Sequence, residues 1–178
     1  MSFNETVLNI RFANQEEFDK IHQFNHAIFA EEIPQHEKKE DGRLIDVYHA
    51  RNTYILAMLG EELVGMVCYN AERPFSLDRK MKGIDKFLPP HNNLVEIRLF
   101  AVKKELRKQG IAIKMLQLLI PHLIDKGYDL GVISASLKEL ELYNNIGAVA
   151  FGELVGSAEV PYQPMYFHIA NLKGAFQA

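Results

Sequence analysis

Two cations and one glycine stand together in RKQGIA, residues 107–112, and could bind a phosphate group. The segment follows the apolar run EIRLFAV, residues 96–102, and precedes the apolar run IKMLQLLI, so it predicts a turn from a strand into a helix. Free N–H groups and the helix dipole attract anions at a helix N-terminus. The segment matches neither GxxxxGK[ST] nor GxGxxG, so it is not one of the common nucleotide-binding loops.

The longer stretch LFAVKKELRKQGIAIKML resembles the acyl-CoA motif of the GNAT superfamily of N-acyltransferases. In that motif a strand ending in valine is followed by (R/Q)-x-x-G-x-(G/A) at the start of a helix. Arg107, Gly110 and Ala112 stand at its three defining positions, and LYNNIG (residues 142–147) also matches. The order of the predicted strands and helices also matches that of the family, so the resemblance covers most of the chain. It implies acetyl-CoA or another coenzyme A thioester as acyl donor, and an amine as acceptor.

The same resemblance assigns residues to the binding of coenzyme A. Amides from residue 108 to residue 112 would face the pyrophosphate, with charge-assisted contacts from Arg107. One departure from the family is a serine at 136, where asparagine is usual, and another is Ala148 after Gly147, where phenylalanine is usual. The residues expected to bind coenzyme A are Phe100, Ala101, Val102, Arg107, Lys108, Gln109, Gly110, Ile111, Ala112 and Ser136.

Acyl transfer to an amine needs a base, a donor for the thioester oxyanion and an acid for the departing thiolate. Glu96 stands where histone-acetylating members of the family have a base, and the alternative is that it pairs with Arg98 or with a cation of a loop. Tyr143 matches the tyrosine that protonates the thiolate in many members, and the alternative is an aromatic core residue. A backbone N–H near residues 100–102 would bind the oxyanion.

Strand alternation predicts which side chains of this strand share a face. One face would carry Glu96, Arg98, Phe100 and Val102, and the other Ile97, Leu99 and Ala101. The family resemblance places Phe100, Ala101 and Val102 beside the thioester, where Phe100 would limit the length of the acyl chain.

No metal site is expected, although His22 and His26 are four residues apart on a predicted helix. Neither a third ligand nor an H-E-x-x-H pattern accompanies them. His91, just before the catalytic strand, could assist proton transfer, but a polar loop histidine is the simpler interpretation. Cys68 lies in the apolar run LVGMVCY and reads as a buried thiol.

The elements that must position these residues alternate along the chain. Strands are expected in TVLNIRFA, TYILAML, LVGMVCYN, LVEIRLFAV, LGVISAS, AVAFGELV and MYFHIANL. Helices are expected after Asn14, in IDVYHARN, from about residue 110 to 126 with a bend or restart at Pro121, and in LKELELYNNI. Residues 71–93 have no clean period, and a connection this long is usually functional or mobile. Its cations could receive an acceptor carboxylate or be solvated: Arg73, Arg79, Lys80 and Lys82.

This pattern predicts one domain over residues 1–178 with an α/β (α+β) fold, a mixed, mostly antiparallel sheet flanked by helices. A net charge of −3 argues against nucleic-acid and membrane-surface binding, and no run reaches the length of a membrane span. With a single cysteine, the chain is expected to be cytoplasmic. A homodimer is left open.

Three functions remain open at this point. The first is an N-acetyltransferase acting on a primary amine of a small molecule or a protein. The second is an enzyme that moves a longer acyl chain onto an amino-acid-like acceptor. Parts of the first predicted helix, FNHAIFAEEIPQ, and of the strand EIRLFAV resemble acyl-homoserine-lactone synthases and N-acyl amino acid synthases. The third is a non-catalytic domain that binds coenzyme A.

Overall fold

An eight-stranded sheet forms the centre of residues 6–172, the part of the chain that this computed structural model describes. The strands are β1 (Leu8–Phe12), β2 (Thr53–Leu59), β3 (Glu62–Asn70), β4 (Leu94–Val102), β5 (Leu130–Ser136), β6 (Val149–Ala150), β7 (Val155–Gly156) and β8 (Pro161–His168). The α-helices are α1 (Phe18–His26), α2 (Ser76–Lys80), α3 (Ile111–Asp125), α4 (Leu140–Asn145) and α5 (Ile169–Leu172).

The strand order confirms the predicted mixed, mostly antiparallel sheet. It runs β1-β2-β3-β4-β5-β8-β6, with β7 paired to the other end of β8. Only β4 and β5 are parallel, and α3 is the crossover helix that joins them. The segment RKQGIA, which was predicted to bind a phosphate group, therefore lies between the end of β4 and the start of this crossover helix.

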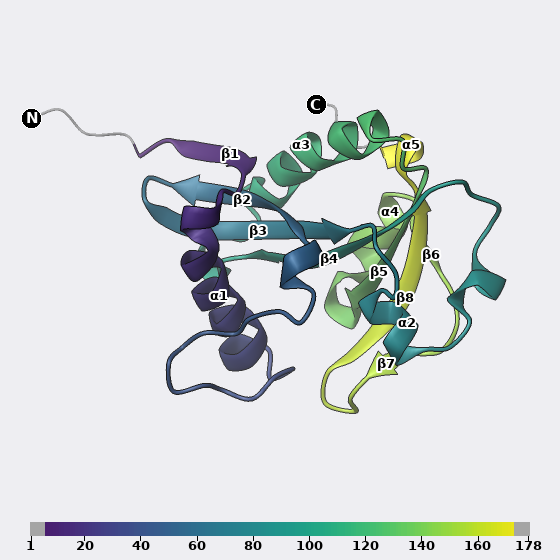
Figure 1. The fold of residues 1–178 in the computed structure, drawn as a ribbon, viewed down its shortest axis with the longest axis horizontal. Coiled ribbons are helices and arrows are strands. Elements are labelled where there is room, and N and C mark those ends of the chain that lie inside the picture. Colours follow the sequence, from purple (N-terminus) through teal and green to yellow (C-terminus); the bar gives the residue numbers. More distant parts are fainter. Residues whose placement is uncertain (1–5, 173–178) are drawn as a thin grey trace, which may run out of the picture.

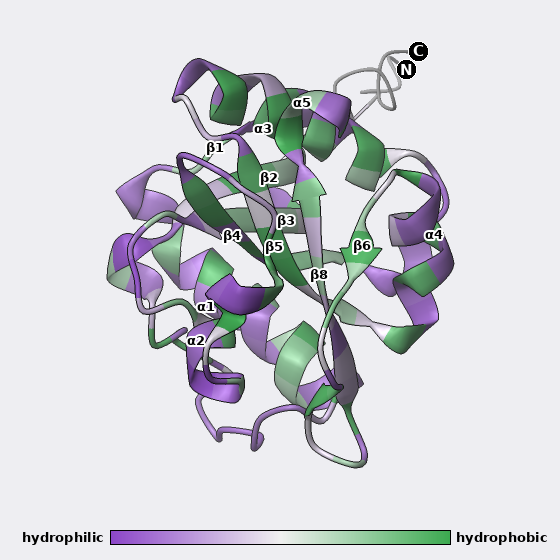
Figure 2. Cartoon of the chain, turned by 90° about the vertical axis from the view of Figure 1, so that its right-hand side faces the viewer, coloured by the Kyte–Doolittle hydropathy of each residue, from purple (hydrophilic) through white to green (hydrophobic). Residues whose placement is uncertain are grey.

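Helices cover both faces of the sheet (Figure 1). On one face, α3, α4 and α5 pack on a core that contains Val95, Met115 and Ile133. On the other, α1 covers a second core around Leu56 and Met66, and α2 packs its Leu77 beside β5 and β8. The central strands are largely hydrophobic in Figure 2, as expected for a sheet buried on both sides.

Strand β4 carries a bulge that changes its pairing with β3. Cys68 of β3 pairs with Arg98 and Met66 pairs with Ala101, so two residues of β4 oppose one residue of β3. Leu99, inside the bulge, has a φ of 52°. On the other side, pairing of β4 with β5 ends at Glu96. Beyond Glu96, β4 therefore lacks a ladder partner on the β5 side, and the sheet opens there.

Several local expectations were wrong. IDVYHARN is mostly irregular, with only a 3-10 turn at His49–Arg51. Of the bend or restart expected at Pro121, the restart is absent, because α3 is continuous through this residue. The end of MYFHIANL is the helix α5, and AVAFGELV holds only the two-residue strand β6 and the first residue of β7. The segment 71–93 contains α2 and a 3-10 helix, Ile84–Phe87.

Within residues 6–172, no helix is both long enough and apolar enough to cross a bilayer.

Candidate active site

The loop before α3 presents unpaired backbone amides. Lys108 has a φ of 65° and Gly110 a φ of 85°, which turns the chain sharply into the helix. In the described part of the chain, no backbone carbonyl accepts a hydrogen bond from the N–H of Lys108, Gln109 or Gly110. The next amides, from Ile111 onward, belong to the first turn of α3, whose N–H groups have no acceptor within the helix. Together these donors can hold an anion of the size of a pyrophosphate.

Glycine at position 110 suits the backbone conformation of this loop, and the space beside it is open. A φ of 85° is a conformation that residues with a Cβ adopt only under strain. A Cβ built at Gly110 would meet no atom within 4 Å, so the space beside it is open to a ligand. Ala112 packs its methyl partly against the core, and Ile111 is buried there. The side chains of Ile111 and Ala112 therefore anchor the start of α3 to the core.

Arg107 is already engaged by the protein. Its Nε donates to the carbonyl oxygen of Val102 at 2.9 Å, and its guanidinium lies 2.5 Å from the carboxylate of Glu32. Glu32 ends the π-helix Ala27–Glu32, which continues α1. The side chain of Arg107 thus ties the end of β4 to a segment on the opposite face of the sheet.

The bulge corrects the predicted faces of β4. Glu96 and Arg98 lie on the α1 face, but Phe100 and Val102 belong to the α3 face, with Ile97. Leu99 and Ala101 pack on the α1 side. The reason is the extra residue, because one inserted residue reverses the alternation for the rest of the strand. Phe100 and Glu96 therefore do not share a face.

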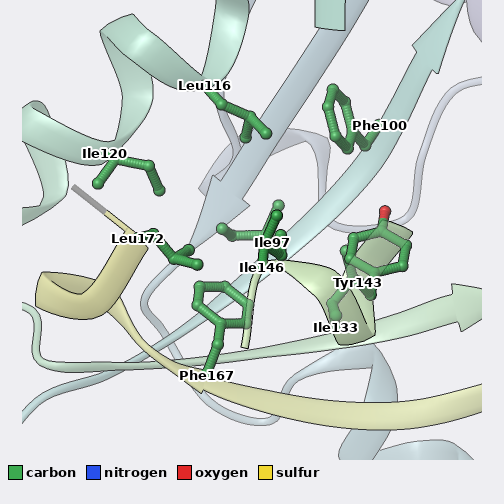
Figure 3. A pocket seen from close by; sticks show the side chains of 9 residues that line it. All are labelled: Ile97, Phe100, Leu116, Ile120, Ile133, Tyr143, Ile146, Phe167 and Leu172. Atoms are coloured by element: carbon green, nitrogen blue, oxygen red, sulfur yellow. The ribbon is translucent and has the colours of Figure 1, made fainter. Parts of the chain in front are cut away.

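An apolar cavity lies on the α3 face beside the bulge, with a volume of about 20 Å³. Figure 3 shows Phe100 and the hydroxyl of Tyr143 at one end and Phe167 and Leu172 at the other. The remaining lining residues are aliphatic: Ile97, Leu116, Ile120, Ile133 and Ile146. By volume it holds about one water-sized group.

Tyr143 extends from α4 into this cavity (Figure 3). Burial raises the pKa of its phenol, and nearby Glu139 adds to the effect. The phenol is therefore protonated at neutral pH. It makes no hydrogen bond to any other residue in the described part of the chain, so it is available to a ligand. Ser136, at the end of β5, accepts a hydrogen bond from the amide of Lys138 at 3.4 Å.

Glu96 is the most buried carboxylate at the site, with 1% of its surface exposed. It accepts hydrogen bonds from the amides of Ser76 and Leu77, each at 3.0 Å, and from the Ser76 hydroxyl at 2.8 Å. The Nε of Arg98 is 3.3 Å away. The carboxylate therefore joins the first turn of α2 to β4, and the pairing with Arg98 that the sequence suggested is present.

Arg98 leads to two residues that the sequence reasoning missed. Its guanidinium donates to both oxygens of Asp46, at 2.6 and 2.9 Å, and lies 4.8 Å from the ring centroid of Tyr48. Hydrogen bonding and charge from Arg98 outweigh burial and lower the pKa of Asp46. The two missed residues were expected in a helix. The sequence carried no clear signal for this placement, because the apolar residues Ile45 and Val47 are exposed while Asp46 is partly buried.

Four of the five cations of the segment 71–93 were candidates to receive an acceptor carboxylate, and their contacts differ. Arg73 forms ion pairs with Asp78 and Asp85, so it closes the loop on itself. Arg79 and Lys80 contact aromatic rings, and Lys82 is exposed. His91, the alternative proton carrier, has its Nδ1 2.9 Å from the carbonyl oxygen of Pro89.

Comparison with solved structures confirms the fold. An acyl-homoserine lactone synthase, BjaI, with SAM and isopentyl-CoA, has a TM-score of 0.74 at 16% identity, over 90% of this chain and 80% of BjaI. FeeM, an N-acyl amino acid synthase from uncultured soil microbes, gives 0.69 at 15% identity over 94% of each chain. YncA, a putative acetyltransferase from Salmonella typhimurium with acetyl-CoA, gives 0.62 at 18% identity, covering 91% of this chain and 94% of YncA.

Comparison with family sequences identifies the family. The sequence model described as the acetyltransferase (GNAT) family matches residues 16–148, which include the loop before α3, Glu96 and Tyr143. No curated protein sequence matches the chain. The resemblance inferred from RKQGIA is confirmed, and so is the expectation that the chain is an acyltransferase. This chain belongs to the acetyltransferase (GNAT) family.

Proposed function

We propose that this chain transfers a short acyl group, most readily acetyl, from a coenzyme A thioester to a primary amine. The observation that carries the proposal is the position of the open amide loop directly after the bulged strand. Lys108, Gln109 and Gly110 offer unpaired N–H groups where β4 ends. A thioester donor held there by its pyrophosphate could extend its pantetheine arm along β4, toward the gap beyond Glu96.

The chemical step needs groups that these residues can supply. Neither Leu99 nor Phe100 forms a regular ladder pair with β3 or β5, so a backbone N–H of the bulge is our candidate oxyanion donor. The neutral amine attacks the thioester carbon, the C–S bond breaks, the nitrogen loses one proton to solvent, and the leaving thiolate takes one proton. Tyr143 supports the last step, because its raised pKa keeps a proton on the phenol at neutral pH.

We propose that Glu96 orders the site and does not act as the base. Each of its two oxygens already accepts at least one hydrogen bond from α2, and the group is almost fully buried. A general base must reach the proton of the incoming amine, and these contacts leave Glu96 little capacity for that. The acceptor would then react in its unprotonated form.

The volume of the cavity supports the proposal that acetyl is the preferred acyl group. At about 20 Å³ it has room for a methyl-sized group beside Phe100 and Tyr143, and a longer chain would need side chains to move. The second candidate, transfer of a longer chain, is favoured by the entirely apolar lining on the way to Leu172. The solved structures similar to this chain include one with isopentyl-CoA and one with acetyl-CoA.

The direct test is the release of free thiol from acetyl-CoA in the presence of a panel of primary amines. Mass spectrometry should find the acceptor heavier by one acetyl group, in an amount equal to the thiol released. Calorimetry with coenzyme A should in parallel detect binding. Binding without any product over the whole panel would instead support a non-catalytic coenzyme A-binding domain.

A further inference from the structure

Two cations at the end of α2 have no carboxylate partner. Within residues 6–172, no acidic group lies at ion-pair distance from Arg79 or Lys80, whereas Arg73 and Arg98 are both paired. The guanidinium carbon of Arg79 is 5.4 Å from the ring centroid of Tyr48, and the Nζ of Lys80 is 5.4 Å from that of Tyr162. Aromatic faces thus hold both cations near the site without neutralising them.

Tyr48 adds an unpartnered polar group to the same place. Its side chain is 5% exposed, and its hydroxyl is buried with no hydrogen-bond partner. Guanidinium groups of three arginines, Arg51, Arg79 and Arg98, lie within 5.7 Å of its ring centroid. A buried hydroxyl without a partner is destabilising. A ligand oxygen that accepted a hydrogen bond from the Tyr48 hydroxyl would remove that penalty.

The surroundings of Lys80 also favour an anion. Although its side chain is exposed, enough protein surrounds the ammonium that desolvation lowers its pKa. The carboxylates of Glu96 and Asp46 act in the opposite direction, and the cation of Arg98 acts with the desolvation. Arg98 is itself neutralised through its pairing with Asp46. An anionic group bound beside Lys80 would stabilise its charged form.

These groups lie on the face from which an acceptor could reach the bulge. Glu96 ties the start of α2 to β4, and Lys80 follows Ser76 by about one helical turn. The apolar cavity with Tyr143 lies on the opposite face. Donor and acceptor would therefore approach the gap in the sheet from its two sides.

We infer that Arg79, Lys80 and the Tyr48 hydroxyl form a binding site for a carboxylate of the acceptor, so that the preferred substrate is an amine that also carries a carboxylate. The inference rests on the proposed acyl transfer and adds the class of acceptor. Two unpaired cations and one hydroxyl donor suit a carboxylate, whose two oxygens can accept several hydrogen bonds.

The test compares amino acids with the amines that lack their carboxylate. Acetyl-CoA turnover would be measured with tyrosine against tyramine, phenylalanine against phenethylamine, and leucine against 3-methylbutylamine. The expected result is a kcat/KM at least tenfold higher for the α-carboxylate member of each pair. Taurine and phosphoethanolamine distinguish sulfonate and phosphate from carboxylate. Equal rates for both members of every pair, or a preference for phosphoethanolamine, would overturn the inference but leave acyl transfer standing.

Single-residue variants test which cations bind the carboxylate of the acceptor. Lys80→Met and Arg79→Met should each raise KM for the preferred amino acid at least tenfold and leave KM for its decarboxylated partner within twofold. Lys82→Met, which removes an exposed cation of the same segment, should change neither. An equal effect of all three variants would point to general charge rather than a site. Coenzyme A affinity, measured by calorimetry, should stay unchanged in each, and its loss would implicate the donor site instead.

Tyr48→Phe separates a ligand-binding role from a structural one. Removing an unpartnered hydroxyl should leave the melting temperature unchanged or raise it. If the hydroxyl binds the acceptor, KM for the amino acid should nevertheless rise severalfold. A lower melting temperature with an unchanged KM would show that the hydroxyl serves the fold and would remove Tyr48 from the site.

Discussion

Glu32 and Arg107 form an ion pair of 2.5 Å between the two halves of the proposed site. Glu32 ends the π-helix that continues α1, and Arg107 belongs to the donor loop after β4. Both side chains are partly exposed, so an ion pair of this kind contributes about 0.2–1 kcal/mol. A pyrophosphate that needs Arg107 must compete with Glu32 for the same guanidinium. The pair therefore sets part of the free-energy cost of donor binding.

Glu32→Gln should tighten coenzyme A binding. The substitution frees Arg107 from a charge partner worth up to about 1 kcal/mol, so the dissociation constant should fall by up to about fivefold. Calorimetry with coenzyme A at low salt measures the change, since screening weakens exposed pairs. Glu31→Gln is the matched control, because Glu31 is the adjacent acid and does not contact Arg107. Weaker binding of Glu32→Gln would show that Glu32 positions Arg107 rather than competing for it.

Gly110→Glu should abolish coenzyme A binding. The side chain would enter the open space beside the loop amides and bring a negative charge to the phosphate position. The φ of 85° makes any other residue strained, by about 1–2 kcal/mol. Gly110→Ala carries the same strain without the charge and fits the space, so it should retain most of the affinity. Equal binding by both variants and the wild type would remove the loop from the donor site.

The turn from β4 into α3, which holds the proposed donor loop (residues 107–112), could be predicted from the sequence because its signals are local. A valine-ended apolar strand, a basic turn, a glycine and an apolar helix lie within about twenty residues, and each reflects backbone geometry that is independent of the rest of the fold. The sheet class followed from the order of such segments. The family resemblance then assigned roles to residues that local patterns alone leave undefined, including Tyr143.

The bulge of β4 and the residues around Arg98, where the acceptor is proposed to bind, could not be predicted in the same way. The bulge at Leu99 depends on the pairing with β3, and EIRLFAV by itself alternates as a regular strand. Asp46 and Tyr48 lie in an irregular segment that is fixed by Arg98, which is about fifty residues away in the sequence. Contacts of this kind are set by tertiary packing, which a periodic pattern does not encode.

Glu96→Gln should lower stability more than it lowers turnover. The variant keeps one acceptor oxygen but removes a buried negative charge from beside Arg98, and breaking such a pair costs about 3–5 kcal/mol. Chemical unfolding should show the loss directly. If Glu96 only orders the site, the pH profile of kcat/KM should keep its shape and follow the deprotonation of the amine. A titrating group that disappears from that profile in Glu96→Gln would restore Glu96 as the base.

Tyr143→Phe should reduce kcat by about 100-fold, the effect of losing a general acid. The change removes only the hydroxyl, so acetyl-CoA affinity and the melting temperature should remain those of the wild type. Single-turnover measurements at saturating substrates would isolate the chemical step. Tyr128→Phe provides a control, since Tyr128 packs near Tyr69, away from the cavity lining. An unchanged kcat in Tyr143→Phe would leave Tyr143 as a packing residue.

The length of the acyl group depends on Phe100, which lines the cavity at the end nearest the hydroxyl of Tyr143 (Figure 3). With about 20 Å³ available, acetyl should fit, and kcat/KM should fall from acetyl- to butyryl- and octanoyl-CoA with one common acceptor. Phe100→Ala removes the ring and joins its volume to the cavity. Each buried CH₂ should then gain about 0.8 kcal/mol, or roughly fourfold in kcat/KM, until the space is filled. The optimum of the variant should therefore move to a longer chain, with coenzyme A affinity unchanged. A wild-type rate that already rises steadily to octanoyl-CoA would contradict the acetyl proposal, because it would mean that the apolar lining opens toward Leu172 during turnover.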